Sequence, residues 1–287
     1  MTKTVRFDGL KTADRLKTII SSQVEKLSDE SRQKKLCSLL IGQDKASHLY
    51  TEIKKRYAKE VGINFEIIYH DKLSFPKALE IIGDLNNNEM VSGIMVQLPL
   101  PDDWEKRQKS KLLSSITPSK DIDCLGANNL GKITQEADEY LPAAVEAVMT
   151  ALEAGKIALS DKNICVIGNS SLVGMPLSVL LSNKGATVTI CNRSTHNLEE
   201  WTKKADILIS ATGQASLIKG DMVKEGVVAI DVGSPKGDFD FNSVAAKASF
   251  ITPVPGGIGP LTVACLMKNF IRAVNGISPG LLQNNEE

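Results

Sequence analysis

The residues CVIGNSSLVGMP, Cys165–Pro176, stand at the centre of a strand–loop–helix pattern. The preceding residues Asn163–Ile167 are mostly apolar and predict a short buried strand, and Leu172–Asn183 predict a helix with its apolar side chains on one face. The small residues of the loop, Gly168 to Ser171, allow backbone N–H groups to reach an anion at the N-terminus of the helix. A second strand, Ala186–Cys191, follows. This order of elements predicts the first half of a dinucleotide-binding fold.

The glycine pattern of this loop is incomplete. A dinucleotide-binding loop typically reads G-x-G-x-x-G, because glycines permit the tight turn and the close approach of the backbone to phosphate. Gly168 fits the pattern and Gly174 lies one residue beyond the place of the last glycine, but Ser170 stands in place of the middle glycine. The loop alone also fits an ordinary strand-to-helix turn, so the prediction depends on the rest of the chain.

Length and charge restrict the class of protein. A chain of 287 residues exceeds a typical single domain, so two lobes are expected. Its 34 basic and 34 acidic residues cancel, which leaves no overall field to attract nucleic acid or a membrane surface. We see no signal peptide and no apolar run approaching about 18 residues. Five scattered cysteines without metal-ligand spacing indicate free thiols. We expect a cytoplasmic protein with no nucleic-acid, membrane or metal partner.

Strands and helices alternate along the chain, which predicts an α/β protein with parallel sheets. The expected strands of the first lobe, a three-layer α/β domain, are Lys35–Ile41, Asn64–Tyr69 and Val91–Gln97. Its expected helices are 11–27, Asp44–Glu60, Phe75–Leu85 and Asp103–Leu113. An alanine-rich helix, Leu141–Leu152, leads into the dinucleotide lobe, where further strands are expected at Asp206–Ser210, Val227–Val232 and Ser249–Thr252. An amphipathic helix, Leu261–Val274, follows.

Polar residues gather at the carboxyl ends of the first-lobe strands, where open α/β sheets bind ligands. Ser47, Tyr50 and Lys54 share one helix face, and Gln97 ends a strand. Each has a simpler interpretation: Lys54 as a solvated lysine beside other cations, and Gln97 as a side chain that caps the following turn. Asp121 and Asp123, in the next loop, also fit a solvated surface turn.

The stretch ITPVPGGIGPLT, Ile251–Thr262, is harder to explain as a structural loop. Three prolines and three glycines in a dozen residues make a stiff segment that a ligand can approach closely. We therefore expect ligand contacts here.

Five motifs together resemble the bifunctional methylenetetrahydrofolate dehydrogenase/cyclohydrolase family, the FolD type, over nearly the whole chain. They are S-x-x-Y-x-x-x-K from Ser47, VQLPLP from Val96, P-x-K-D-x-D from Pro118, G-x-S-x-x-V-G-x-P from Gly168, and ITPVPGGIGPLT from Ile251. The resemblance implies a folate-binding catalytic domain, 1–140 completed by the C-terminal helix in 262–287, and a Rossmann-type NAD(P)-binding domain, 141–261. It also implies folate bound between the lobes and a homodimer.

The resemblance further implies the roles of individual residues. Lys54 is the proton-transfer group, Gln97 positions it, and Asp123 binds the pterin edge. Substrate contacts are expected from Ser47, Tyr50, Leu98, Pro99, Gly259 and Pro260. Cofactor contacts are expected from Gly168, Asn169, Ser170, Arg193, Ser234 and Thr262, with NADP as the preferred cofactor and NAD as a second possibility.

Several residues depart from the family pattern and bear on cofactor choice and on the balance of the two activities. Cys124 and Gly126 replace the usual glycine and histidine, and Ala143-Ala144 replace Cys-Thr. Asn169 replaces an arginine, and Ser234 an isoleucine. Cys124 is expected to lie at the folate cleft and crowd the loop, so Cys124→Gly is expected to raise folate affinity or hydrolysis.

Three functions stay open on the sequence: NADP-dependent oxidation of 5,10-methylenetetrahydrofolate with hydrolysis of the product to 10-formyltetrahydrofolate; a dehydrogenase with weak or lost cyclohydrolase activity; and a non-catalytic folate- or nucleotide-binding regulator. The first is favoured, since a binding module does not need Lys54, Gln97 and Asp123 together.

Overall fold

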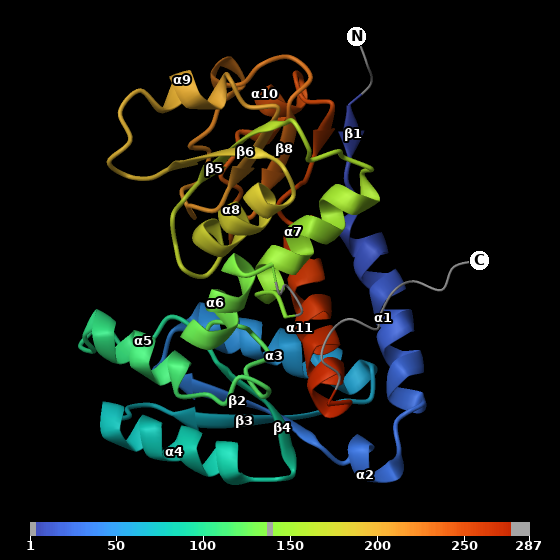
Figure 1. Cartoon of the computed structure of the whole chain (residues 1–287), viewed down its shortest axis with the longest axis vertical. Helices are drawn as coiled ribbons and strands as arrows, with labels where there is room; N and C mark the ends of the chain where they lie inside the picture. The colour runs from blue at the N-terminus through green and yellow to red at the C-terminus, as the bar shows by residue number, and fades with distance from the viewer. Residues whose placement is uncertain (1–3, 137–139, 277–287) are drawn as a thin grey trace. The chain divides into compact units, whose positions relative to one another are not determined.

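The computed structural model describes residues 4–136 and 140–276, which form two compact units (Figure 1). The six-stranded unit comprises residues 4–14, 133–136 and 144–265. The three-stranded unit comprises residues 15–132, 140–143 and 266–276. Helices α1 (Gly9–Glu25) and α11 (Ile258–Val274) contribute residues to both units.

The six-stranded unit is built on one parallel sheet in the order β1-β9-β8-β7-β5-β6. Its strands are β1 (Val5–Arg6), β5 (Asn163–Ile167), β6 (Thr187–Cys191), β7 (Ile207–Ser210), β8 (Val228–Asp231) and β9 (Phe250–Ile251). The predicted strand–loop–helix–strand pattern is confirmed, because β5 leads through a short loop to α8 (Gly174–Asn183) and then to β6. β1 was not predicted: two residues are too few to show a period, and its partner β9 lies far away in the chain.

Both faces of this sheet carry apolar side chains and are covered by helices, as expected for parallel strands. Helix α8 packs against β5 and β6. Cys165, Leu208 and Ala229 point to the other face, which is covered by the short helices α9 (Leu198–Thr202) and α10 (Phe241–Ala245) and by the 3₁₀ turn η1 (Gly220–Met222). Helix α7 (Ala143–Ala154) matches the predicted alanine-rich helix within two residues at each end.

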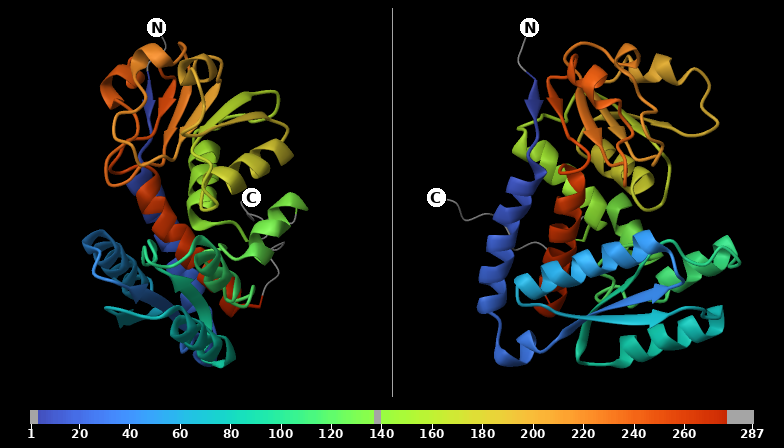
Figure 2. Two further views of the ribbon diagram at one scale, coloured as in Figure 1. Left: turned by 90° about the vertical axis from the view of Figure 1, so that its left-hand side faces the viewer. Right: turned by 180° about the vertical axis from the view of Figure 1, so that it is seen from behind.

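The three-stranded unit contains a second parallel sheet, in the order β3-β2-β4. Its strands are β2 (Lys35–Ile41), β3 (Asn64–His70) and β4 (Val91–Val96), close to the predicted ranges. Helices α3 (Lys45–Glu60) and α4 (Phe75–Asn87) cover opposite faces of the sheet (Figures 1 and 2), which confirms the predicted three layers. The core against α4 includes Leu39, Ile82 and Ile94, all fully buried.

The remaining helices of this unit are α2 (Asp29–Arg32), α5 (Lys106–Ser114) and α6 (Ala127–Thr134). Helix α5 begins three residues after the predicted Asp103, because Glu105 serves as its N-cap and the Glu105 N–H donates to Oε1 of Gln108 at 2.8 Å. Helix α6 was not predicted. Within the described residues, no helix is long and apolar enough to cross a membrane.

Candidate functional site

Helix α3 carries three of the predicted site residues and is anchored at its first turn. The Asp44 carboxylate accepts the Ser47 N–H at 2.7 Å and so caps the helix. The Ser47 hydroxyl lies 2.8 Å from the same carboxylate and 3.1 Å from the Leu98 carbonyl oxygen. Ser47 therefore ties the start of α3 to the loop after β4, while Tyr50 is exposed and Lys54 half-buried along the same helix.

Lys54 and Gln97 meet, as the resemblance implied. The Lys54 ammonium donates to Oε1 of Gln97 at 2.9 Å, and Nε2 of Gln97 donates to the Leu98 carbonyl at 2.8 Å. An ammonium can only donate, so this pair fixes which way the buried Gln97 amide points. The Gln97 backbone is held by its own N–H, which donates to the Leu39 carbonyl at 2.9 Å, and exposed Pro99 follows Leu98 through a cis peptide bond.

The loop that carries Asp123 runs beside β4 and is fixed at both its start and its middle. The Ile94 N–H donates to the Lys120 carbonyl at 2.7 Å, and Ile94 pairs with Asp121 in a parallel bridge. The Lys120 ammonium donates to the carbonyls of Leu85, Asn86 and Asn88 at the end of α4, at 2.7–3.2 Å. These contacts extend the sheet by one irregular segment. Asp123 follows this segment and lies near enough to Lys54 for the two charges to attract each other.

Burial shifts the pKa values of the two charged groups in opposite directions. Burial lowers the pKa of Lys54 from its ordinary value, and the attraction of Asp123 opposes this shift only in part. Burial raises the pKa of Asp123, again against the attraction of Lys54. A lysine with a lowered pKa populates its neutral, basic form closer to neutral pH, so Lys54 can both accept and return a proton.

Cys124 follows Asp123 in a left-handed backbone conformation with φ of 56°, a conformation that glycine adopts without strain. Its side chain is fully buried, with Sγ 3.8 Å from Nδ2 of Asn269. The same amide donates to the Ile122 carbonyl at 2.9 Å. The loop accommodates the Cys124 side chain by packing it inward, and the expected gain of folate affinity or hydrolysis in Cys124→Gly stays a prediction.

Asp121 is a buried carboxyl that holds the beginning of α6. It accepts the Gly126 N–H at 2.8 Å and a weaker bond from the Asn129 side chain at 3.2 Å. Burial, with the nearby charge of Asp123 adding to it, raises the pKa of Asp121 to about 6 despite these donors. In the folded protein the carboxyl therefore binds its proton more tightly than in the unfolded chain.

This shift predicts that Asp121 favours folding most below pH of about 4, and that this contribution is lost as the pH rises through about 6. Asp121→Asn removes this titration. The free energy of unfolding of the variant minus that of the parent should therefore increase by up to about 3 kcal/mol between pH about 4 and about 7. Urea unfolding at several pH values measures the difference. Asp29→Asn, at an exposed carboxyl in α2, is the control. A difference that stays constant with pH would contradict the prediction.

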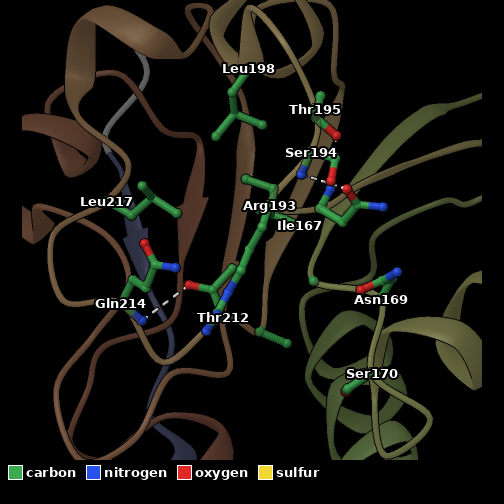
Figure 3. A pocket seen from close by; sticks show the side chains of 13 residues that line it. Ile167, Asn169, Ser170, Arg193, Ser194, Thr195, Leu198, Thr212, Gln214 and Leu217 are labelled. Carbon is green, nitrogen blue, oxygen red and sulfur yellow. Dashed lines mark hydrogen bonds between the residues drawn. The ribbon is translucent and has the colours of Figure 1, made fainter.

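A separate pocket of ≈ 620 Å³ lies in the six-stranded unit (Figure 3). Its lining comes from the ends of β5, β6 and β7 and comprises Ile167, Gly168, Asn169, Ser170, Asn192, Arg193, Ser194, Thr195, Leu198, Ala211, Thr212, Gln214 and Leu217. Four of the predicted cofactor residues, Gly168, Asn169, Ser170 and Arg193, are thus brought together. Thr195, Thr212 and Gln214 were not predicted, although their place just after strands β6 and β7 is a signal that could have found them.

The glycines of the loop are required by close packing. Gly168 has φ of 106°, and a Cβ on Gly174 would lie 1.8 Å from the Gly168 carbonyl oxygen. The first turn of α8 therefore rests directly on the loop, which brings the N-terminal end of the helix to the pocket.

Arg193 supplies a positive charge to the pocket. Its side chain extends from the turn after β6 toward Thr212 (Figure 3). The turn is held by hydrogen bonds from Asn192 N–H to Thr195 Oγ1 at 2.9 Å and from Ser194 N–H to Asn192 Oδ1 at 2.8 Å. Across residues 4–136 and 140–276 the guanidinium has no hydrogen-bond or ion-pair partner, so it is available to an anion.

The other predicted residues also lie in the six-stranded unit. Ser234 is exposed after β8, and Gly259, Pro260 and Thr262 occupy the first turns of α11. None of these four lines the pocket. The described part of the chain contains no group of three His, Cys, Asp or Glu side chains that could hold a metal ion.

Comparison with known proteins decides the family. Residues 7–123 match the model of the catalytic domain of tetrahydrofolate dehydrogenase/cyclohydrolase, and residues 142–277 match the model of its NAD(P)-binding domain. The chain belongs to this family. It is 40% identical over 281 residues to the bifunctional protein FolD of Bacillus subtilis, covering 95% of this chain and 98% of the relative. It is 42% identical over 272 residues to the bifunctional protein FolD 2 of Lactobacillus johnsonii, covering 92% and 95%.

Solved structures agree with the family assignment. The bifunctional FolD enzyme of Campylobacter jejuni has a TM-score of 0.90 and 36% identity, covering 95% of this chain and 99% of that one. The Trypanosoma brucei FolD structure, described as a complex with NADP and an inhibitor, has a TM-score of 0.90 and 30% identity, covering 96% and 99%.

A FolD family member with both domains is an enzyme of one-carbon folate metabolism. The protein oxidises 5,10-methylenetetrahydrofolate with an NAD(P) cofactor and hydrolyses the methenyl product to 10-formyltetrahydrofolate. No finding favours the alternatives of a dehydrogenase with weakened hydrolysis or of a non-catalytic regulator.

Proposed function

We propose that the three-stranded unit performs the folate chemistry through Lys54, Gln97 and Asp123. The observation that carries this proposal is the 2.9 Å hydrogen bond from Lys54 to the buried amide of Gln97, at a position where burial lowers the pKa of the lysine. Asp123, half-buried at the end of the loop beside β4, supplies an acceptor for the amino and N–H groups of a pterin.

In the hydrolytic step, water adds to the carbon that bridges two folate nitrogens. Neutral Lys54 accepts a proton from this water as the carbon–oxygen bond forms, and returns it to a nitrogen as the carbon–nitrogen bond breaks. The remaining hydroxyl proton leaves to solvent as the formyl C=O forms, which accounts for the positive charge of the methenyl substrate. Gln97 Oε1 holds the Lys54 Nζ atom in place during both transfers. Ser47 keeps Lys54 and Gln97 in register by joining α3 to the Leu98 carbonyl. Exposed Tyr50 and Pro99 and half-buried Leu98 supply apolar surface for the substrate rings.

The dehydrogenase step demands less of these residues. The nitrogens on either side of the bridge carbon stabilise the cation that remains, and a cofactor held in the dinucleotide pocket would supply the hydride acceptor. The contribution of the chain is to hold the two reactants in contact. We assign Gly259 and Pro260 to substrate contact and Ser234 and Thr262 to cofactor contact on the resemblance alone.

We assign the pocket of the six-stranded unit to the dinucleotide, with NADP preferred. The residues suit that ligand: a glycine turn rests on a helix N-terminus, and Arg193 crosses the pocket without a partner among the described residues. An NAD-selective site places an acid at the end of the second strand to hold the ribose 2′-OH, whereas here that position reads Cys191-Asn192-Arg193. Asn169 supplies no second cation, which weakens the preference.

Turnover should therefore be higher with NADP than with NAD at matched concentration. Arg193→Met should lower kcat/KM for NADP by about tenfold to a hundredfold, the worth of one hydrogen bond to a charged group, and change kcat/KM for NAD little. Methenyl formation, followed by absorbance with each cofactor side by side, measures both. The control is Lys203→Met, which removes an exposed cation from the end of α9, away from the pocket. Equal or better turnover of the parent with NAD would refute the preference.

The folate chemistry and the dinucleotide site are thus assigned to different units. The sequence-based boundaries, 1–140 with 262–287 and 141–261, stay predictions, and residues 137–139 and 277–287 lie outside the described residues. We also propose a homodimer and a cytoplasmic location, on the family resemblance; light scattering and cell fractionation test them.

A further inference from the structure

One wall of the dinucleotide pocket is the loop that follows β7. Ala211, Thr212, Gln214 and Leu217 line this wall, and the Gln214 N–H donates to Thr212 Oγ1 at 3.1 Å (Figure 3). Backbone hydrogen bonds join this loop to the interior, from the Ala211 N–H to the Ile167 carbonyl at 2.8 Å and from the Ser216 N–H to the Gly237 carbonyl at 3.0 Å. Between them, Thr212 makes the side-chain contact with the interior. Both its N–H, at 2.7 Å, and its hydroxyl, at 2.9 Å, donate to Oδ2 of Asp238.

Asp238 is fully buried and is not itself a lining residue of the pocket. The same Oδ2 accepts a third hydrogen bond, from the Ser210 hydroxyl at 2.7 Å. Three donors thus converge on one oxygen, and they set the direction in which the chain leaves β7. No other described side chain holds both polar groups of Thr212.

Asp238 is held from the opposite side by the end of β8. Its N–H donates to Oδ1 of Asp231 at 3.1 Å, and the Phe239 N–H donates to Oδ2 of Asp231 at 3.0 Å. The Asp238 carbonyl accepts the Ile218 N–H at 3.0 Å, beyond the far end of the pocket wall. The Asp238 carboxylate is therefore held in place by the end of β8, and the pocket wall is hydrogen-bonded to it.

We propose that Asp238 is a positioning residue for the dinucleotide pocket, holding this wall in its binding conformation through Thr212. The inference rests on the proposed assignment of this pocket to NADP. Without the carboxylate, the loop samples other conformations. The free energy needed to order the loop then reduces the free energy of cofactor binding. The consequence is weaker cofactor binding, with little effect on turnover once the cofactor is saturating.

The second oxygen of Asp238 gives different expectations for asparagine and alanine at this position. Oδ1 is buried without a hydrogen-bond partner among the described residues. A Cβ on Gly233 would lie 2.5 Å from this oxygen and 2.9 Å from Oδ1 of Asp231, so oxygens of both carboxyl groups lie beside Gly233. In Asp238→Asn, the amide oxygen can replace Oδ2 and the amide nitrogen can point toward Asp231. Asparagine should therefore preserve the wall, whereas alanine cannot.

The test uses the full enzyme and both of its reactions. Asp238→Ala should raise KM for NADP about tenfold or more, with kcat at saturating NADP and the hydrolysis of added methenyltetrahydrofolate within about twofold of the parent. Asp238→Asn should restore KM to near the parent value. Thr212→Val, which loses the hydroxyl but keeps the backbone N–H and the side-chain volume, should raise KM by a smaller factor and serves if Asp238→Ala fails to fold.

Each outcome decides the proposal. An unchanged KM for NADP in Asp238→Ala overturns the proposal, and Thr212→Val decides in the same way if the alanine variant does not fold. An equal loss of both reactions in soluble Asp238→Ala also overturns it, because general destabilisation gives that result. Arg193→Met distinguishes a failure of the positioning role of Asp238 from a failure of the assignment of the pocket to NADP. If Arg193→Met weakens NADP binding while Asp238→Ala does not, only the positioning role fails. If neither variant affects NADP, the assignment of the pocket itself fails.

Discussion

Replacing Lys54 with methionine should abolish hydrolysis of methenyltetrahydrofolate and reduce hydride transfer far less. Water addition and ring opening require a proton to move, and a positioned acid–base group typically contributes about 10²–10⁴-fold to such a step. The Lys54 ammonium sits 2.9 Å from Gln97 Oε1 in surroundings that lower its pKa, which suits that transfer. Hydride instead leaves a carbon that two nitrogens already activate, so a proton donor adds little.

The two reactions can be followed separately by absorbance on the same preparation. Methionine keeps most of the lysine stem, so substrate binding should survive the change. Lys55→Met is the matched control, since it removes the same charge from the next residue of α3, where the side chain is exposed. The hydrolysis rate of the parent should also fall as the pH drops and Lys54 becomes fully protonated, with a midpoint below that of an ordinary lysine. A Lys54→Met enzyme that hydrolyses at near the parent rate would refute the assignment.

Gly174→Ala should remove most of the dehydrogenase activity and leave the hydrolysis. The new Cβ would lie 1.8 Å from the Gly168 carbonyl oxygen and 2.7 Å from its carbon, both backbone atoms that cannot move aside as a side chain can. The start of α8 or the loop must shift by an ångström or more, and a misplacement of that size can cost about 100-fold in rate. Overpacking should also lower the free energy of unfolding by about 1–3 kcal/mol.

The control is Gly83→Ala in α4, where no atom lies within 4 Å of the added Cβ. Alanine there should stabilise the helix by about 0.8–1 kcal/mol and leave both activities unchanged. Steady-state rates at several NADP concentrations, with hydrolysis measured on the same samples, give the comparison. Full dehydrogenase activity in Gly174→Ala would mean that the loop does not need its observed conformation to bind the cofactor.

Local patterns were sufficient for the long elements. β2 and β5 have the ranges predicted from their apolar runs, and α3 ends next to Gly62, which has φ of 84°. Strand and helix periods are properties of neighbouring residues, so the alternating α/β order can be read from them. The motifs also named Lys54 and Gln97 as partners, through resemblance to a family rather than through spacing.

The elements and contacts that escaped prediction join segments far apart in the chain. β1 pairs with β9, and Asp238 binds Thr212, so neither relation leaves a mark on local periodicity. Helices α9 and α10 have five residues each, too few to establish a period. Cys124, with φ of 56°, is buried against Asn269, a contact with a distant helix that the sequence did not predict. Sequence alone thus supplied the order of the elements and the reactive residue types. Only the folded chain settled which polar atoms meet, because packing of distant segments, not local preference, brings them within hydrogen-bonding distance.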